Sequence, residues 1–415
     1  MSKWLWRIRQ LVKRIWFRAS LFSLLAIATA LVAIVAEPYI PRDVPTKIGA
    51  DAVDNILGII ASSMLAVTTF SLSTMVSAYS AATSNVTPRA TRLVMEDSTT
   101  QNVLATFVGS FLYSLVAIIA LSTGAYGETG RVVLFIVTIV VIALIVVTLL
   151  RWIDHLSRLG RVTETTARVE KAVQAALLDD ATSPHMGAQP LAALPEGTAP
   201  VLSDEIGYVQ HIDIAGLARI AERGDGTVYV QARPGAFVDR TKPIARVQGL
   251  GTADDKLAIQ ACFTIADVRS FDQDPRFGLS VMTEIASRAL SAAVNDPGTA
   301  IDVIGRLVRV FSRYADQRRQ SGEAQEDRVF VAAIEVADMF DDCFTPIARD
   351  GAGMVEVGIR LQKALLSLAQ LGAPFTSAAQ SHSADALARA ERALDADRDK
   401  LILRGLQAQV AAIPA

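Results

Sequence analysis

The sequence has little of what builds a reactive or metal-binding centre. Its two cysteines, Cys262 and Cys343, are too few for a disulfide framework or a thiolate metal site. Its four histidines are not closely paired, which argues against a histidine-rich metal centre. The GxxxxGKS/T phosphate loop, the GxGxxG fingerprint, the HExxH pair and the GxSxG elbow are all absent from the sequence. We therefore expect no enzymatic activity and no cofactor.

Charge is also scarce. Charged residues make up 20% of the 415 residues and hydrophobic residues 51%, whereas a soluble domain has roughly 25% charged and about 45–50% apolar residues. The formal net charge of −2 gives no reason to expect nucleic-acid binding. The excess of apolar residues lies in the first third of the chain, which indicates a membrane domain.

Four apolar stretches without charged residues occur before residue 152, and each approaches or exceeds the about 20 residues that cross a bilayer core of about 30 Å. They predict transmembrane helices at about 19–36, 55–80, 101–122 and 132–150, because backbone groups in lipid must be bonded within the segment. Ala28-Thr29-Ala30 also fits a signal-peptide cleavage site, but the apolar run continues past it, so a retained helix is favoured.

Lysine and arginine in the short flanking segments set the expected orientation. Residues 1–18 carry six basic residues and no acidic one, and further arginines follow the second and fourth helices. The opposite side has only Arg42, Lys47 and Arg131, mixed with acidic residues. We therefore expect a membrane protein with both termini and the large C-terminal region in the cytoplasm.

The basic N-terminal segment, residues 1–18, predicts an amphipathic interfacial helix. Trp4, Ile8, Leu11, Val12 and Ile15 fall on one face at helical spacing, which suits an anionic lipid headgroup layer. The alternative is a helix packed on the protein's own cytoplasmic domain. The pattern alone does not choose between them.

The second apolar stretch, residues 55–88, is too long and too polar for a plain anchor. Six of its hydroxyl residues fall within a sector of roughly 80° of a helix, and the third helix carries three more beside Gly109. These nine, which are the candidate pore-lining residues, are Ser62, Thr69, Ser73, Ser77, Ser80, Ser84, Thr106, Ser110 and Ser114. Such a stripe lines a neutral aqueous path or, more commonly, mediates contacts between helices. No charged residue or histidine lies in the middle of a span, so proton relays and voltage sensing are not expected.

The remaining chain predicts a cytoplasmic α+β region. Helical spacing continues after the fourth span, and 181–200 is rich in proline, so residues 152–200 form a helical stalk and linker. Alternating patterns in 201–271 predict a small β-rich module, and residues 272–415 predict a helical module. The expected fold class is an all-α membrane domain of four transmembrane helices, residues 19–151, joined to this α+β region.

The segment 269–300 contains two Asp-Pro pairs, Asp274-Pro275 and Asp296-Pro297. Each is typical of a helix start, with aspartate as N-cap and proline in the first turn. The oxygen-rich residues nearby could also converge on a ligand or a hard cation, although caps and ion pairs are the commoner reason for such residues. The ligand or ion candidates are Asp272, Gln273, Asp274, Arg288, Asn295 and Asp296.

Several motifs recur in an order that resembles the bacterial family of predicted membrane proteins called domain of unknown function 2254. They are the serine- and threonine-rich second span, TFVGSFLYSLV in the third span, GYVQHID, RPGAFV, QDPRFG and RALSAAVNDPGTA. Ala292 stands where the family usually has proline. The resemblance implies a multi-span membrane protein with a cytoplasmic domain, and it brings no activity, substrate or catalytic residue.

Two functions remain open. One is a homo-oligomeric ion channel or pore with a neutral path lined by serine and threonine and with a cytoplasmic gating domain. The other is a membrane-anchored sensor or scaffold whose cytoplasmic domain binds a ligand or a partner. Membrane lipids and further copies of the chain are the expected partners of both, and the ligand or ion is open.

Overall fold

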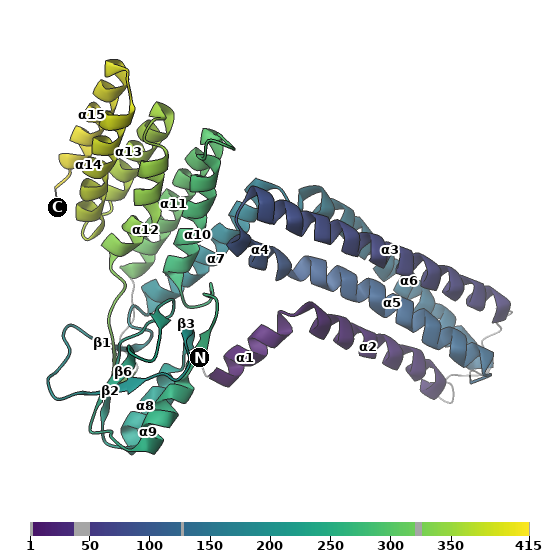
Figure 1. Cartoon of the computed structure of the whole chain (residues 1–415). Coiled ribbons are helices and arrows are strands. Elements are labelled where there is room, and N and C mark those ends of the chain that lie inside the picture. Colours follow the sequence, from purple (N-terminus) through teal and green to yellow (C-terminus); the bar gives the residue numbers. More distant parts are fainter. Residues whose placement is uncertain (1–2, 37–49, 126–127, 320–325, 415) are drawn as a thin grey trace. The chain divides into compact units, whose positions relative to one another are not determined.

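The structure is a computed structural model that describes residues 3–36, 50–125, 128–319 and 326–414. The chain divides into two compact units. The membrane unit is Arg7–Thr165, and the C-terminal unit combines Met1–Trp6 with Thr166–Ala415 (Figure 1). The N-terminal residues therefore belong to the same compact unit as the end of the chain.

The membrane unit is helical, and its long helices run side by side (Figure 1). It contains most of α1 (Lys3–Val12), then α2 (Ile15–Ala36), α3 (Ala50–Asn85), α4 (Pro88–Met95), α5 (Ser98–Ser122) and α6 (Glu128–Arg158). Helix α4 begins at a Thr87-Pro88 cap, and the N-cap of α5 is Asp97, whose side chain accepts from the Thr100 N–H. These caps allow the chain to turn between α3 and α5.

Three helices of the described chain are long and apolar enough to cross a membrane: Ala52–Ala81, Ser98–Ser122 and Gly130–Arg158. Up to four spans result if the bent pair Lys3–Val12 and Trp16–Val32 counts as one. The expectation of a multi-span helical membrane domain is therefore confirmed, while the fourth span stays a prediction. Arg42 and Lys47, which entered the orientation argument, lie outside the described residues.

Helix α5 is the centre of the membrane unit, since it packs against α2, α3 and α6. A Cβ atom on Gly109 would lie 3.3 Å from the carbonyl oxygen of Phe22, so glycine permits α2 to approach closely. Trp152 of α6 donates its indole N–H to the buried Ser71 hydroxyl of α3 at 2.9 Å. Small residues and single hydrogen bonds thus join these helices.

The C-terminal unit contains two small sheets. One has five strands in the order β1-β8-β4-β6-β2, with β8 parallel to β1 and β4 and the other pairs antiparallel. The other is antiparallel, in the order β5-β3-β7. The strands are β1 (Ala188–Pro190), β2 (Ala199–Leu202), β3 (Gly207–Ile212), β4 (Thr227–Val230), β5 (Phe237–Val238), β6 (Pro243–Gln248), β7 (Phe263–Ala266) and β8 (Glu326–Val331).

Helices complete this unit. They are α7 (Val162–Thr182), α8 (Ile214–Arg223), α9 (Ala253–Cys262), α10 (Pro275–Ala289), α11 (Pro297–Arg318), α12 (Val336–Asp350), α13 (Val355–Ala369), α14 (Phe375–Ala393) and α15 (Asp397–Ala411). The two Asp-Pro pairs begin α10 and α11 as the sequence predicts: each aspartate is the N-cap and each proline starts its helix. In Figure 1 the C-terminal helices lie next to one another as a layered stack.

One local expectation needs correction. The segment 181–200, expected as a linker, contains β1 and the start of β2, because β1 pairs with β8 and β2 with β6. The last strand of the β-rich segment, β7, ends at Ala266. Helix α14 ends at Ala393, because the extended Leu394 is buried with Ala390 and Leu403 and α15 returns along α13 and α14.

Candidate functional site

The serine and threonine stripe of α3 lies on the exposed side of that helix. The stripe residues are Ser62, Thr69, Ser73, Ser77, Ser80 and Ser84, and all six are exposed within the chain. The first four donate their hydroxyl protons to carbonyl oxygens four residues earlier, over 2.9–3.1 Å. These bonds satisfy the donors within the helix, so the face presents lone pairs outward. We call these six residues the α3 hydroxyl face.

The three hydroxyl residues of α5 have the opposite placement. Thr106, Ser110 and Ser114 are buried inside the membrane unit, on either side of the close α2 contact at Gly109. The structure therefore does not bring them together with the α3 hydroxyl face on one surface. Within a single copy of the chain, the α5 residues serve helix packing.

The outer face of α6 differs from that of α3. Within 132–150 its exposed side chains are all aliphatic, and they include Ile136, Ile139, Val140, Leu144, Val146 and Val147. The exposed side of α3 instead mixes its hydroxyls with large apolar side chains, which are Ile59, Leu65, Phe70, Leu72 and Val76. Such a surface matches lipid chains. Exposed hydroxyls along α3 are therefore not a general property of the outer surface of this unit.

In the C-terminal unit, three motifs singled out in the sequence meet at the β5-β3-β7 sheet. The Gly235 N–H of RPGAFV donates to the Val209 carbonyl of GYVQHID at 2.8 Å. Gln273 of the QDPRFG motif accepts from the Ile212 N–H at 3.2 Å. A Cβ on Gly235, whose φ is +94°, would lie 2.3 Å from Asp274, so only glycine allows this approach.

We call the place where GYVQHID, RPGAFV and QDPRFG meet the motif junction. Asp274 is its most constrained residue. Its carboxylate is buried, caps α10 through the Phe277 N–H at 3.0 Å, and accepts two bonds from Arg269 at 2.7 and 2.9 Å. Burial raises the pKa of the Asp274 carboxyl, and the Arg269 guanidinium opposes that rise. Asp274 therefore has a structural role in the cap and in the ion pair.

A second buried charge network joins the end of α7 to α11. Asp180 accepts from Arg233 at 2.9 Å and from the Tyr314 hydroxyl at 3.0 Å. Arg233 also donates to the carbonyl oxygens of Pro184 and Ala332. Burial raises the pKa of Asp180 and lowers the pKa of Arg233, and each residue opposes the shift of the other. One guanidinium thus ties together three separate segments of the chain.

The six ligand or ion candidates do not form one site. Asp272 and Gln273 lie with Asp274 before α10, whereas the Asp296 N–H bonds to the carbonyl of Ala289, the last residue of α10. The 15 residues of α10 separate these ends by roughly 22 Å. Thr299 donates to both oxygens of Asp296 and holds the pKa of that carboxyl below its ordinary value.

The other two candidates lie near Asp296. Arg288 is exposed in the last turn of α10, and Asn295 is exposed with a φ of +49°. Across the described ranges, no group of three or more histidine, cysteine, aspartate or glutamate side chains is arranged to hold a metal ion.

Both thiols are buried, and burial is the largest cause that raises their pKa values, to about 11 for Cys262. They are therefore poor nucleophiles near neutral pH. The sequence analysis did not single out Asp180, Arg233 or Tyr314. One indication of this network was present in the sequence, because Arg233 belongs to the RPGAFV motif. Asp180 and Tyr314 belong to no motif that the sequence analysis identified.

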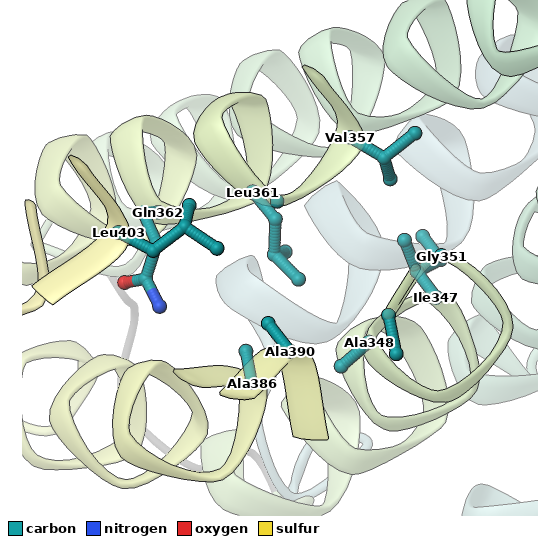
Figure 2. A pocket seen from close by; sticks show the side chains of 11 residues that line it. Ile347, Ala348, Gly351, Val357, Leu361, Gln362, Ala386, Ala390 and Leu403 are labelled. Atoms are coloured by element: carbon teal, nitrogen blue, oxygen red, sulfur yellow. The ribbon is translucent and has the colours of Figure 1, made fainter. Parts of the chain in front are cut away.

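A small cavity lies where α12, α13, α14 and α15 meet (Figure 2). It encloses about 10 Å³, which is about the space of one water molecule. Its lining is apolar except for Gln362, and Figure 2 shows Leu361, Ala390 and Ala348 around it. Gln362 already pairs with Ser383 through both ends of its amide. The cavity is a packing gap and does not fit an organic ligand.

Comparison with known proteins gives the family. The family described as "Predicted membrane protein (DUF2254)" matches residues 12–367. The chain belongs to this family. The matched range includes the α3 hydroxyl face and the motif junction, so the resemblance stated from the sequence motifs is confirmed.

Two curated relatives are an uncharacterized protein of Mycobacterium bovis and an uncharacterized protein of Mycobacterium tuberculosis. Each is 33% identical over 140 residues, which is 32% of this chain and 27% of the relative. The match thus spans about a quarter of the length of these relatives. No solved structure matches the chain significantly.

Proposed function

We propose that this chain forms a homo-oligomeric pore in the bacterial inner membrane, in which the α3 hydroxyl faces of neighbouring copies surround a neutral path for an ion or a small polar solute. The observation that carries the proposal is the outward placement of all six stripe residues. The hydroxyls on this face match lipid less well than the exposed aliphatic side chains of α6 do. Facing hydroxyls from several copies would replace part of a solute's hydration shell.

The proposed topology has four spans, with both termini in the cytoplasm. A hydrogen bond of 3.0 Å between the Lys3 backbone N–H and the Asp213 carboxylate supports this topology. The bond requires the segment before α2 and the segment after α6 to lie on one side of the membrane. Spans α3, α5 and α6 alone would put them on opposite sides, and α2 supplies the fourth crossing. The basic flanks then favour the cytoplasmic side.

In this proposal the C-terminal unit gates the pore. Its N-terminal residues lead into α2 and its helix α7 follows α6 after only three residues, so it is joined to the membrane unit at two points. A movement of this unit would therefore act on the first and last spans of each copy.

Ion flux into liposomes that contain the purified chain tests the pore. Replacing Ser73 and Ser77 by leucine fills the path with apolar side chains, so we expect flux to fall at least about tenfold, which corresponds to a barrier of about 1.4 kcal/mol. The matched control replaces Val140 and Val147 of α6 by leucine and should keep the flux of the unaltered chain. Absence of flux in the unaltered chain, or equal flux in both variants, would reject the pore.

A second candidate function is a membrane-anchored sensor or scaffold. The observation in its favour is the convergence of GYVQHID, RPGAFV and QDPRFG in the C-terminal unit, away from the spans. Thermal unfolding of the full chain with added nucleotides or divalent cations would test for a ligand. A raised midpoint in a chain that conducts nothing would favour this function over the pore.

A further inference from the structure

Helix α1 has two different faces. At 100° per residue, Trp4, Leu5, Ile8, Leu11 and Val12 fall within a sector of roughly 120°, and Trp6 lies on the opposite side of the helix. Trp4 is 71% exposed and Leu5 54% exposed, whereas Trp6 is 6% exposed. One side of α1 is therefore covered, while a stripe of large apolar side chains is open.

The covered side is held by the C-terminal unit. The Trp6 ring stacks on the fully buried His211 ring of β3, with centroids 5.3 Å apart. The Lys3 ammonium donates to the carbonyl oxygens of Ala261 and Phe263, both at 2.7 Å, where α9 ends. A cation at this position complements the negative end of the helix dipole. These contacts fix the rotation of α1 about its own axis.

The open side has the composition of a membrane-surface helix. Arg7, Arg9 and Arg14 are exposed beside the apolar stripe, and the first 18 residues contain no acidic side chain. Tryptophan and aliphatic residues flanked by arginines suit the boundary between anionic headgroups and acyl chains. A second copy of the chain would have to cover this basic surface with acidic groups, and the α1 stripe supplies none.

The bend between α1 and α2 allows α1 to lie along the membrane surface. The helix Lys3–Val12 is bent by 70° from Trp16–Val32 at a break of a few residues. Figure 1 shows this turn between α1 and α2. If α2 crosses the bilayer, as the proposed four-span topology has it, a helix bent so far from it runs nearly along the membrane surface.

We propose that α1 binds the anionic headgroup layer through Trp4, Leu5, Ile8, Leu11 and Val12 while Trp6 and Lys3 hold its opposite face to β3, α9 and β7. The helix thereby links the lipid surface to the C-terminal unit. The lipid charge acts on the arginines, and any tilt of the helix is transmitted to the Trp6–His211 stack. This inference rests on the four-span topology but not on the existence of a pore.

The test places an environment-sensitive fluorophore on the full chain in vesicles of phosphatidylcholine with about one third phosphatidylglycerol. Leu5→Cys carries the label on the open face, and Leu401→Cys carries it on α15, where Leu401 is 62% exposed. The native thiols are buried and react slowly at neutral pH. We expect doxyl-labelled lipids to quench the position-5 label at least twice as strongly as the position-401 label, and aqueous iodide to show the reverse order.

Three outcomes would overturn the proposal: iodide quenching at position 5 equal to that at position 401, protection of position 5 from both quenchers, or equal lipid quenching with and without phosphatidylglycerol. Protection from both quenchers would mean that protein covers the face. Leu11→Cys repeats the measurement should the first variant fail to fold. Arg7→Gln with Arg14→Gln should reduce lipid quenching in anionic vesicles only. Because ion flux plays no part, failure of the pore leaves this result intact.

Discussion

Arg233 joins segments that the chain order keeps apart. Its guanidinium contacts Asp180 at the end of α7 and the carbonyl oxygens of Pro184 and Ala332, while Asp180 also holds the Tyr314 hydroxyl. A buried ion pair of this kind adds little stability compared with an apolar pair, but removing one partner leaves a buried charge uncompensated. The cost of a single substitution here is therefore large.

Arg233→Met should lower the free energy of unfolding of the C-terminal unit by about 3–5 kcal/mol near neutral pH. The control is Arg404→Met, whose pair with Glu391 is half exposed, and it should cost less than about 1 kcal/mol. Urea unfolding of the purified full chain, followed by circular dichroism, measures both. Equal losses in the two variants would contradict a special role for Arg233.

The loss in free energy of unfolding caused by Arg233→Met, called the deficit below, should depend on pH. Burial raises the pKa of Asp180 above its ordinary value of 3.8, and Arg233 opposes the rise, so removing Arg233 raises that pKa further. A carboxyl with a raised folded pKa contributes stability that is complete below its unfolded pKa and is lost as the pH rises through its folded pKa. The deficit should thus be small near pH 4 and grow toward pH 7. A deficit that does not change over this range would contradict the assignment to Asp180.

At the scale of elements, the membrane helices pack through small residues on specific faces. Gly109 of α5 admits the α2 backbone, whereas a Cβ on Gly58 of α3 would meet no atom within 4 Å. A side chain at position 109 would therefore press on a neighbouring helix, whereas a side chain at position 58 would meet no neighbour. This contrast separates the packing role of α5 from the open face of α3.

Gly109→Leu should destabilise the membrane unit by about 1–3 kcal/mol, because the larger side chain must displace α2. Gly58→Leu is the matched control and should leave stability unchanged or slightly raised, since glycine is a poor helix former. Thermal unfolding in detergent, followed by tryptophan fluorescence, compares the two variants. A larger loss of thermal stability in Gly58→Leu than in Gly109→Leu would contradict the close packing of α5 against α2.

At the scale of the whole molecule, the C-terminal unit begins within α7 and not after the proline-rich segment. Val169, Val173 and Leu177 of α7 are buried in it, and Gly278 of α10 packs directly against Val173. Glu170 pairs with Arg306 of α11 at 2.7 Å. Strand β1 then adds an edge to the five-stranded sheet. The segment expected to be a stalk and linker is thus part of the core.

A fragment of residues 166–415 should therefore fold and unfold cooperatively in urea, whereas a fragment of residues 201–415 should not. The shorter fragment lacks α7 and β1, so it loses the packing of Val173 on Gly278 of α10 and the Glu170–Arg306 pair with α11, and it leaves β8 without one neighbour. Circular dichroism and urea titration of both fragments provide the measurement. Cooperative unfolding of the shorter fragment would show that α7 is dispensable.

The sequence by itself determined the features that depend on local composition and spacing. Long apolar runs must become helices in lipid, so the membrane unit follows from 98–122 and 132–150 without further information. The Asp-Pro pairs predicted the starts of α10 and α11, because capping involves only neighbouring residues. The family motifs were equally local, and the family match covers them.

Only the tertiary structure decided which faces meet. It placed the α3 hydroxyl face outward and Thr106, Ser110 and Ser114 of α5 inward, although both sets recur at helical spacing. It paired β1 with β8 across more than a hundred residues and joined Asp180 to Arg233 and Tyr314. Periodicity defines a face of a helix or strand, but its partner depends on how the whole chain buries its apolar surface, which no local pattern encodes.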